Sequence, residues 1–283
     1  MPPSWIMGLR ITLGCLVTAT LAACGGAAPG LAGGDVPLVA AAATPAPTGG
    51  ELGLHPGERM TFEVALAGVP VAQAALAVGD IGDVDGRRAI VVSSSMTTAD
   101  AFRWVKDVRD DLTSTIDCDS GLPLTILADV KFGDKLYHAD GTFDASAVEL
   151  VWDRRDGVTR HTHYDFGDVP AHDAHSAMAA MRTWEGEPGE ARTVYIVGGR
   201  RIWQTQMTWV GRETIGTRLG NQPAVRLDGI SVRVDPRLHA EAGKPPRTYS
   251  VWLSDDGDRA PLRVVASTEL GDVTIELTGY ERP

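Results

Sequence analysis

The amino-acid sequence predicts a mainly β protein, either a single curved antiparallel sheet or a half-open barrel, with one or two packed helices. Between residues 58 and 283, short segments alternate apolar and polar side chains, and turn-forming Gly, Asp and Asn residues separate them. Most of these segments follow one another without a helix of about 10–15 residues in between. Parallel strands need such long crossovers, so the pattern favours antiparallel pairing.

The first part of the sheet is a predicted hairpin over residues 58–78. Phe62 and Val64 share one face of its first strand, and Gly68-Val69-Pro70 forms the turn. The clearest amphipathic strand covers residues 124–132, where apolar residues occupy every second position. Further strands are predicted near residues 87–95, 108–117, 136–143, 147–153, 158–165, 193–198, 201–210, 224–234, 247–254, 261–268 and 271–280.

Two helices are expected to interrupt the strands. One is predicted over residues 97–106, where Thr97 and Asp100 have the spacing of a capping box. The other begins at about residue 170 or 173 and ends at Trp184, with Ala and Met residues at helical spacing. Its apolar stripe is expected to pack on the sheet.

Composition excludes several classes of protein. The chain has 283 residues, of which 43% are hydrophobic and 22% charged, so it is not disordered throughout. Lys and Arg number 26 against 37 Asp and Glu, which gives a net charge of −11. This acidic balance argues against binding of nucleic acid and against docking on anionic lipid headgroups, since both need a dense basic patch. Three cysteines, none in a CxxC pair, do not predict a disulfide framework.

Residues 1–23 have the parts of a secretory signal peptide. Arg10 precedes an apolar run from Ile11 to Leu21, which is too short to cross a bilayer core of roughly 20 residues. The last residues, with Cys24, form Leu21-Ala22-Ala23-Cys24, which resembles the lipobox of bacterial lipoproteins. In such proteins the cysteine thiol is alkylated with diacylglycerol, and the new N-terminus is acylated after cleavage. The alternative is an ordinary cleaved signal with a cysteine beside the cut.

Residues 24–57 are expected to form a disordered tether. They are rich in Gly, Ala, Pro and Thr and show neither helical nor strand periodicity. With several acyl chains on Cys24, the protein would remain on a membrane almost permanently. Gly25 follows the cysteine in place of the Asp that favours inner-membrane retention in enterobacterial lipoproteins. By this resemblance, the expected location is the outer membrane of a Gram-negative bacterium, facing the periplasm.

Five stretches of the folded part resemble the bacterial envelope family catalogued as domain of unknown function 3108, and they occur in the family's order. They are residues 57–64 with the following Ala-Gly-Val-Pro-Val-Ala, 114–123, 173–182, 211–216, and 251–256 followed by Arg259-Ala-Pro-Leu. The resemblance implies an exported or lipid-anchored protein with a curved antiparallel sheet packed around a helix, similar to periplasmic lipoprotein carriers. It supplies no catalytic residues. The chain departs from the family in its long tether and in a His-rich stretch.

That stretch supplies the candidate metal ligands, His161, His163, His172 and His175. The first two would share one face of a strand, and the last two would be neighbours on a helix. Two imidazoles from each element could surround Zn²⁺, which binds neutral histidine nitrogens. The spacing matches no known zinc signature, and a polar solvated strand face explains the first pair equally well.

Other candidate chemistry has simpler interpretations. The sequence contains no Gly-x-Ser-x-Gly, His-Glu-x-x-His or Ser-x-x-Lys motif. Ser120 is expected to form a turn, and Asp255-Asp256 with Asp258 a hairpin tip rather than a calcium loop. Flanking carboxylates should raise the pKa of Cys118 and quench its reactivity. Trp203 and Trp209 alternate on one strand face and would either line an apolar groove or pack in the core.

The sequence therefore predicts a non-enzymatic envelope lipoprotein whose β-domain binds a lipid, a glycan or a partner protein. Its membrane contact would be the N-terminal lipid, and neither a cofactor nor a nucleic-acid partner is expected. Two alternatives remain open: a metal-dependent hydrolase that uses the four histidines, and a structural envelope-assembly factor without a ligand.

Overall fold

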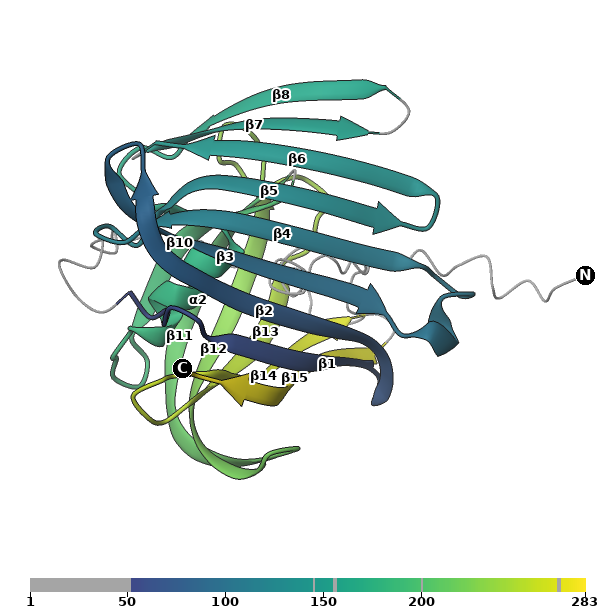
Figure 1. Ribbon diagram of the computed structural model, residues 1–283, viewed down its shortest axis with the longest axis vertical. Coiled ribbons are helices and arrows are strands. Elements are labelled where there is room, and N and C mark those ends of the chain that lie inside the picture. Colours follow the sequence, from purple (N-terminus) through teal and green to yellow (C-terminus); the bar gives the residue numbers. More distant parts are fainter. Residues whose placement is uncertain (1–51, 145, 155–156, 200, 269–270) are drawn as a thin grey trace, which may run out of the picture.

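The computed structural model describes residues 52–283 apart from residues 145, 155–156, 200 and 269–270. In this part of the chain, fifteen strands form one curved sheet, and one α-helix packs against it (Figure 1). The helix is α2 (Ala174–Arg182), and a short 3-10 turn, η2, covers Asp100–Phe102. The strands are β1 (Arg59–Leu66), β2 (Val69–Val84), β3 (Arg87–Thr98), β4 (Val108–Asp117), β5 (Pro123–Phe132), β6 (Lys135–Phe143), β7 (Ala147–Arg154), β8 (Val158–Asp165), β9 (Ala171–His172), β10 (Ala191–Gly198), β11 (Arg201–Thr217), β12 (Gly220–Val234), β13 (Arg247–Ser254), β14 (Pro261–Thr268) and β15 (Gly271–Glu281).

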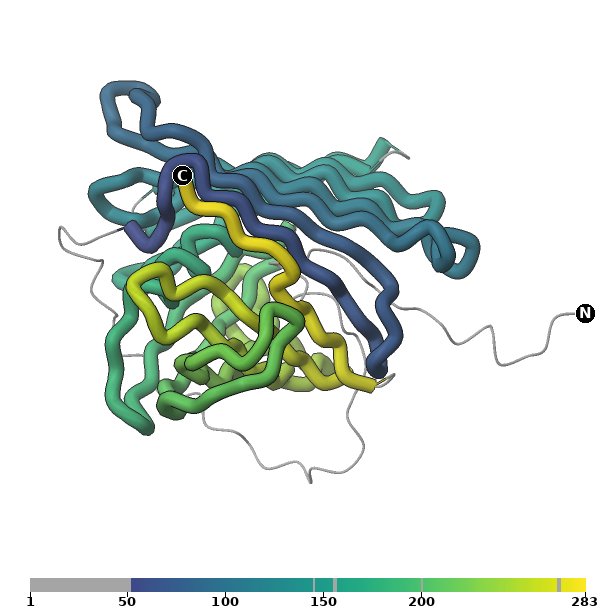
Figure 2. The backbone as a smooth tube through the Cα atoms, turned by 60° about the horizontal axis from the view of Figure 1, so that its bottom comes forward, coloured from purple at the N-terminus to yellow at the C-terminus, as the bar shows by residue number. Residues whose placement is uncertain are grey.

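The sheet consists of two antiparallel meanders that meet where β1 pairs with β15. Strands β1 to β8 form the first meander and β10 to β15 the second, while the two-residue β9 pairs with β10 in parallel. Figure 2 shows the two meanders as separate layers, with the C-terminus beside the start of the described chain. The predicted curved antiparallel sheet is confirmed. No helix in these residues is long and apolar enough to span a membrane.

Period-two alternation explains why these segments form strands. On β4, Val108, Leu112 and Ile116 are buried on the inner face, which faces α2, whereas Arg109 and Thr113 point to the outer face. The predicted strands at 108–117, 158–165, 247–254 and 261–268 coincide with β4, β8, β13 and β14.

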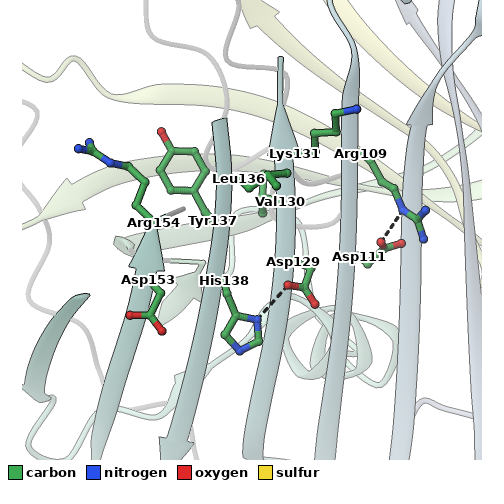
Figure 3. A pocket seen from close by; sticks show the side chains of 10 residues that line it. All are labelled: Arg109, Asp111, Asp129, Val130, Lys131, Leu136, Tyr137, His138, Asp153 and Arg154. Atoms are coloured by element: carbon green, nitrogen blue, oxygen red, sulfur yellow. Dashed lines mark hydrogen bonds and ion pairs between the residues drawn. The ribbon is translucent and has the colours of Figure 1, made fainter. Parts of the chain in front are cut away.

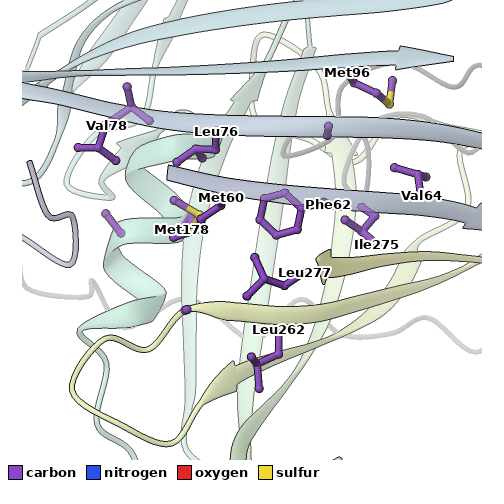
Figure 4. Packing of buried hydrophobic residues seen from close by; sticks show 14 of the residues in the cluster. Met60, Phe62, Val64, Leu76, Val78, Met96, Met178, Leu262, Ile275 and Leu277 are labelled. Atoms are coloured by element: carbon purple, nitrogen blue, oxygen red, sulfur yellow. The ribbon is translucent and has the colours of Figure 1, made fainter. Parts of the chain in front are cut away.

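The core lies between the two meanders, around α2. Met178 of this helix packs among apolar side chains of β1, β2, β3 and β15, including Met60 and Leu76 (Figure 4). On its other side, Ala177 contacts the apolar residues of β10 to β14. Trp203 and Trp209 are 2% and 1% exposed, so they pack in the core and do not line an apolar groove. The predicted long helix and its packing on the sheet are confirmed.

Both ends of α2 are fixed by polar contacts. At its N-terminus, the Asp173 side chain accepts a hydrogen bond from the backbone N–H of Ser176, and the Ser176 hydroxyl caps the backbone in return. At its C-terminus, Arg182 forms a fully buried bidentate ion pair with Glu58, the residue before β1. Burial alone would raise the pKa of Glu58, but the hydrogen bonds and charge of Arg182 outweigh it and lower this pKa.

The predicted helix over residues 97–106 is wrong. Strand β3 continues through Thr98, and only the three residues of η2 are helical. The Thr98 hydroxyl donates to the carbonyl of Val108 and accepts from its N–H, so this residue is bound to the start of β4. Asp100 lies inside the 3-10 turn and does not cap it, since the N-cap position is Ala99 and has no side-chain hydrogen bond.

Candidate functional site

An open groove of about 370 Å³ crosses strands β4 to β7 on the outer face of the sheet (Figure 3). Its lining is mostly charged and comes from neighbouring strands of the first meander. The lining residues are Arg109, Asp111, Asp129, Val130, Lys131, Leu136, Tyr137, His138, Asp153 and Arg154.

The strand register places four of these side chains in one row. Asp111 lies opposite Asp129, Asp129 opposite His138, and His138 opposite Asp153. Directly opposite residues on one face of an antiparallel pair have Cβ atoms roughly 5 Å apart, so the row is continuous across four strands. The next row along the strands places Lys131 between Arg109 and Leu136. The groove therefore presents an acidic row with one imidazole beside a shorter basic row.

Ion pairs organise these two rows. Arg109 Nε donates to Asp111 Oδ2 over 2.6 Å, and His138 Nδ1 lies 2.9 Å from Asp129 Oδ1. Lys131 Nζ reaches out of the groove to Asp107 Oδ2, at 2.5 Å. The hydrogen bond with Asp111 raises the pKa of Arg109. Because most of these side chains are well exposed, each pair contributes at most about 1 kcal/mol to stability.

Asp153 differs from the other acids of the row. Its Oδ1 atom is buried and has no hydrogen-bond partner among the described residues. A buried acceptor without a donor is costly in a folded protein, so such an atom marks a position where a bound group could donate.

This arrangement suits recognition of a polar ligand. Carboxylates accept hydrogen bonds, whereas Arg109 and Lys131 donate them, and the groove offers both within two adjacent rows. The lining contains no Ser, Thr or Cys to act as a nucleophile.

The structure places the four predicted metal ligands in two separate environments. His161 and His163 are exposed on the outer face of β8, where His163 Nδ1 lies 2.6 Å from Glu149 Oε1. His172 and His175 are 4% and 0% exposed and lie in the interior at the start of α2. Within the described ranges, no group of three or more His, Cys, Asp or Glu residues has an arrangement that could hold a metal ion.

His175 instead connects the helix to the first meander. Its Nδ1 lies 2.6 Å from the Ser114 hydroxyl and its Nε2 lies 2.8 Å from the Ser94 hydroxyl. Burial lowers the pKa of His175, and it lowers that of His172 to about 4. Both imidazoles are therefore neutral at physiological pH, and His175 can donate to one serine and accept from the other.

The other candidates have the expected turn positions. Asp117 Oδ1 accepts from the Ser120 N–H and hydroxyl, so this serine forms a turn. Asp256 accepts from the N–H groups of Asp258 and Arg259 in the β13–β14 connection, as expected of a hairpin tip. The Cys118 pKa is raised, first by burial and then by the flanking carboxylates, against the lowering effect of Arg88. The lipidation residue Cys24, the signal peptide and residues 24–51 of the predicted tether lie outside the described residues. Residues 52–57, which also belong to the predicted disordered tether, are instead bound to the domain, since Leu54 is 5% exposed in the core and the Gly57 N–H donates to the carbonyl of Val78.

Sequence reasoning missed the groove. Asp129 and Lys131 were identifiable as the polar face of an amphipathic strand, but their partners on β4, β6 and β7 follow only from the register. The one local signal is the pair of polar residues Tyr137-His138 next to the β5–β6 turn.

Comparisons with known proteins find one matching family and several solved structures with a similar fold. Residues 61–278 match the model of a family described as protein of unknown function, DUF3108, and no curated protein matches the chain. Among solved structures, a β-barrel-like protein of domain of unknown function DUF1849 from Brucella abortus has 9% identity and a TM-score of 0.47, covering 79% of this chain and 96% of that chain. The hypothetical lipoprotein YmcC from Escherichia coli K12 has 9% identity and a TM-score of 0.29, and the match covers 81% of this chain and 88% of that chain. Lipoprotein LppX from Mycobacterium tuberculosis has 13% identity and a TM-score of 0.23, and the match covers 79% of this chain and 87% of that chain.

Proposed function

The chain belongs to the DUF3108 family of proteins of unknown function, and we propose that it is a lipid-anchored protein of the bacterial envelope whose β-domain binds a glycan in the outer groove. The location rests on the lipobox at Leu21-Ala22-Ala23-Cys24 and on the preceding signal peptide. The choice of ligand rests on the groove, and above all on the buried acceptor of Asp153 that lacks a partner.

A glycan fits the groove better than an acyl chain or an apolar peptide does. Sugar hydroxyls both donate and accept hydrogen bonds, as the acidic and basic rows require. An acyl chain needs an apolar cavity, whereas the apolar inner faces of both meanders are buried around α2. A hydrolytic role has less support, because the groove lining has no hydroxyl or thiol nucleophile apart from the phenol of Tyr137.

The anchor would form after export. Cleavage before Cys24 leaves a cysteine whose thiol carries diacylglycerol, and residues 24–51 then connect it to the β-domain, on which Leu54 is already buried. With about six Å × √n for a flexible chain of n residues, such a tether has a root-mean-square length of about 32 Å. The domain would thus remain close to the outer membrane on its periplasmic side.

Acyl labelling in a Gram-negative host tests the anchor. The wild-type chain should incorporate labelled fatty acid and fractionate with the outer membrane, whereas Cys24→Ala should do neither. Label on the Cys24→Ala variant would refute the proposed lipidation site.

A glycan array of bacterial envelope saccharides tests the groove. Asp153→Asn replaces the carboxylate by a neutral amide, and the exchange of a charged hydrogen bond for a weaker neutral one should reduce binding about tenfold. His163→Gln, which lies on the outer face of β8 away from the lining residues, is the matched control. Absence of saccharide binding by the wild type, or equal binding by Asp153→Asn, would refute the proposed ligand site.

A further inference from the structure

One end of the first meander exposes large apolar side chains at the tips of adjacent loops. Trp104, in the loop between β3 and β4, is 84% exposed, and its neighbour Val105 is 40% exposed. Val69, the first residue of β2 after the β1–β2 turn, is 49% exposed. The loops are contiguous, because the Ala99 N–H donates to the carbonyl of Val71 over 2.9 Å. Figure 1 shows η2 projecting from the end of the sheet.

The same end is basic, although the chain as a whole is acidic. The β5–β6 turn joins the β3–β4 loop through a hydrogen bond of 2.8 Å from the Gly133 N–H to the carbonyl of Asp107. Three of the four lysines in the chain lie here, namely Lys106, Lys131 and Lys135. Residues 99–109 and 131–135 together carry five basic and three acidic side chains. Arg103, Arg109 and Lys131 are ion-paired with Asp100, Asp111 and Asp107, so the positive charge of this end comes from Lys106 and Lys135. We call this surface, formed by residues 67–71, 99–109 and 131–135, the Trp104 edge.

The polar group of the exposed indole is already satisfied. Trp104 Nε1 donates to the carbonyl of Ala101 over 2.7 Å, so the ring can leave water without losing a hydrogen bond. Lys106 lies over the Phe132 ring, 4.1 Å from its centroid, and this contact keeps an ammonium group beside the exposed apolar side chains. Tryptophan with nearby Lys and Arg is typical of side chains placed at a membrane–water interface.

We propose that the Trp104 edge is a docking surface for a phospholipid bilayer, with Trp104 and Val105 entering the interface and the lysines contacting lipid phosphates. The net negative charge of the chain does not oppose this, because at physiological ionic strength the Debye length is about 8 Å and more distant acids are screened. Docking goes beyond the lipid anchor: it gives the tethered domain a fixed orientation, with one end of the sheet on the membrane.

Fluorescence quenching of the lipidated protein in vesicles tests this docking. The vesicles contain phosphatidylethanolamine and phosphatidylglycerol at three to one, with brominated acyl chains that quench indoles within the bilayer. Quenching should be clear for the wild type and for Trp252→Phe, whose substituted residue lies on β13, which four strands separate from β3. It should be lost in Trp104→Phe, which is expected to fold because residue 104 is exposed.

A charge variant tests the role of the lysines. Lys106→Glu with Lys135→Glu should lower the docked fraction, since each basic side chain near an anionic surface favours binding about fivefold. Equal quenching of wild type and Trp104→Phe, or no quenching of a wild type that is present on the vesicles, would overturn the proposal and favour a protein partner for this edge. A chain that does not associate with the vesicles at all would instead contradict the lipid anchor, so vesicle flotation distinguishes the two failures.

Discussion

Removing the carboxylate of Glu58 should destabilise the fold more than any surface substitution. Both side chains of the Glu58–Arg182 pair have no exposed surface, and the distances are 2.9 Å from Nη1 to Oε2 and 2.6 Å from Nη2 to Oε1. The Tyr280 hydroxyl also donates to Glu58 Oε1 over 2.9 Å. In Glu58→Ala, Arg182 would keep only the carbonyl of Asp258 as an acceptor.

The expected cost follows from leaving a guanidinium buried without its counter-charge. Breaking a buried ion pair by removing one partner costs about 3–5 kcal/mol. For a domain of this size, 1 kcal/mol lowers the melting temperature by about 2–4 °C, so Glu58→Ala should melt about 10 °C below the wild type. Urea unfolding followed by circular dichroism measures the same loss as a lower midpoint at unchanged slope.

Two control variants separate charge from packing. Glu58→Met with Arg182→Met replaces the pair by apolar side chains and should recover most of the stability, because such replacements are often neutral. Asp119→Ala removes the partner of the exposed Arg88 and should cost less than about 1 kcal/mol. If Glu58→Ala unfolded within 1 kcal/mol of the wild type, the argument from the buried pair would be wrong.

The same pair predicts a pH dependence. Arg182 lowers the pKa of Glu58 below its ordinary value of 4.5, so the carboxylate binds fewer protons in the folded state than in the unfolded state. Its contribution to stability is therefore complete above the ordinary pKa and is lost as the pH falls through the lowered one. The difference in unfolding free energy between wild type and Glu58→Ala should be constant near pH 7 and shrink in acid.

Three further predictions concern single interior or turn positions. Gly229→Ala should cost about 1–3 kcal/mol in urea unfolding, because a Cβ there would lie 2.3 Å from Cζ of Tyr249, whereas Gly257→Ala, in open space, should cost little. His175→Ala should cost about 3 kcal/mol, since the buried hydroxyl of Ser114 and the half-buried hydroxyl of Ser94 lose their imidazole partner, and normal stability would contradict the structural role given to this histidine. Cys118 should react with a thiol reagent at pH 8 more slowly in the folded than in the urea-unfolded chain without its signal peptide, because burial raises its pKa.

The sequence was a good guide to the elements because the signals for strands are local. Alternation and turn residues placed β4 at 108–117 and β8 at 158–165, and Asp173 was among the expected starts of the long helix. The expected helix over 97–106 failed for a non-local reason. Its apolar spacing fits a helix, but the Thr98 hydroxyl bonds to Val108, ten residues away, and holds the chain in strand geometry.

The candidate site could not be predicted from local sequence patterns either, because its residues come together only through the pairing of distant strands. Asp111, Asp129, His138 and Asp153 are separated by 9 to 18 residues and belong to four strands. Only the register makes them one row. The histidines show the opposite error: closeness in sequence suggested one cluster, yet His163 is exposed and His175 is buried, so the pairs occupy different environments.

The five stretches that resemble the family contact one another in two groups, in the interior or at the strand ends. Residues 57–64 and 173–182 meet through Glu58 and Arg182, and residues 114–123 meet 173–182 through Ser114 and His175. Residues 211–216 join 251–256 through Arg212 with Asp255 and through Glu213 with the indole N–H of Trp252.

None of these stretches contains a lining residue of the groove, whose ten residues lie at 109–111, 129–138 and 153–154. The features by which the chain resembles its family therefore account for how the helix and the two meanders are held together, whereas the groove belongs to the part of the sequence between them. It follows that substitutions in the stretches should change stability first, and substitutions in the groove should change binding without unfolding the domain. The family match over residues 61–278 includes β4 to β7 as well as the five stretches, and the identity of the ligand has to be sought in the side chains of β4 to β7.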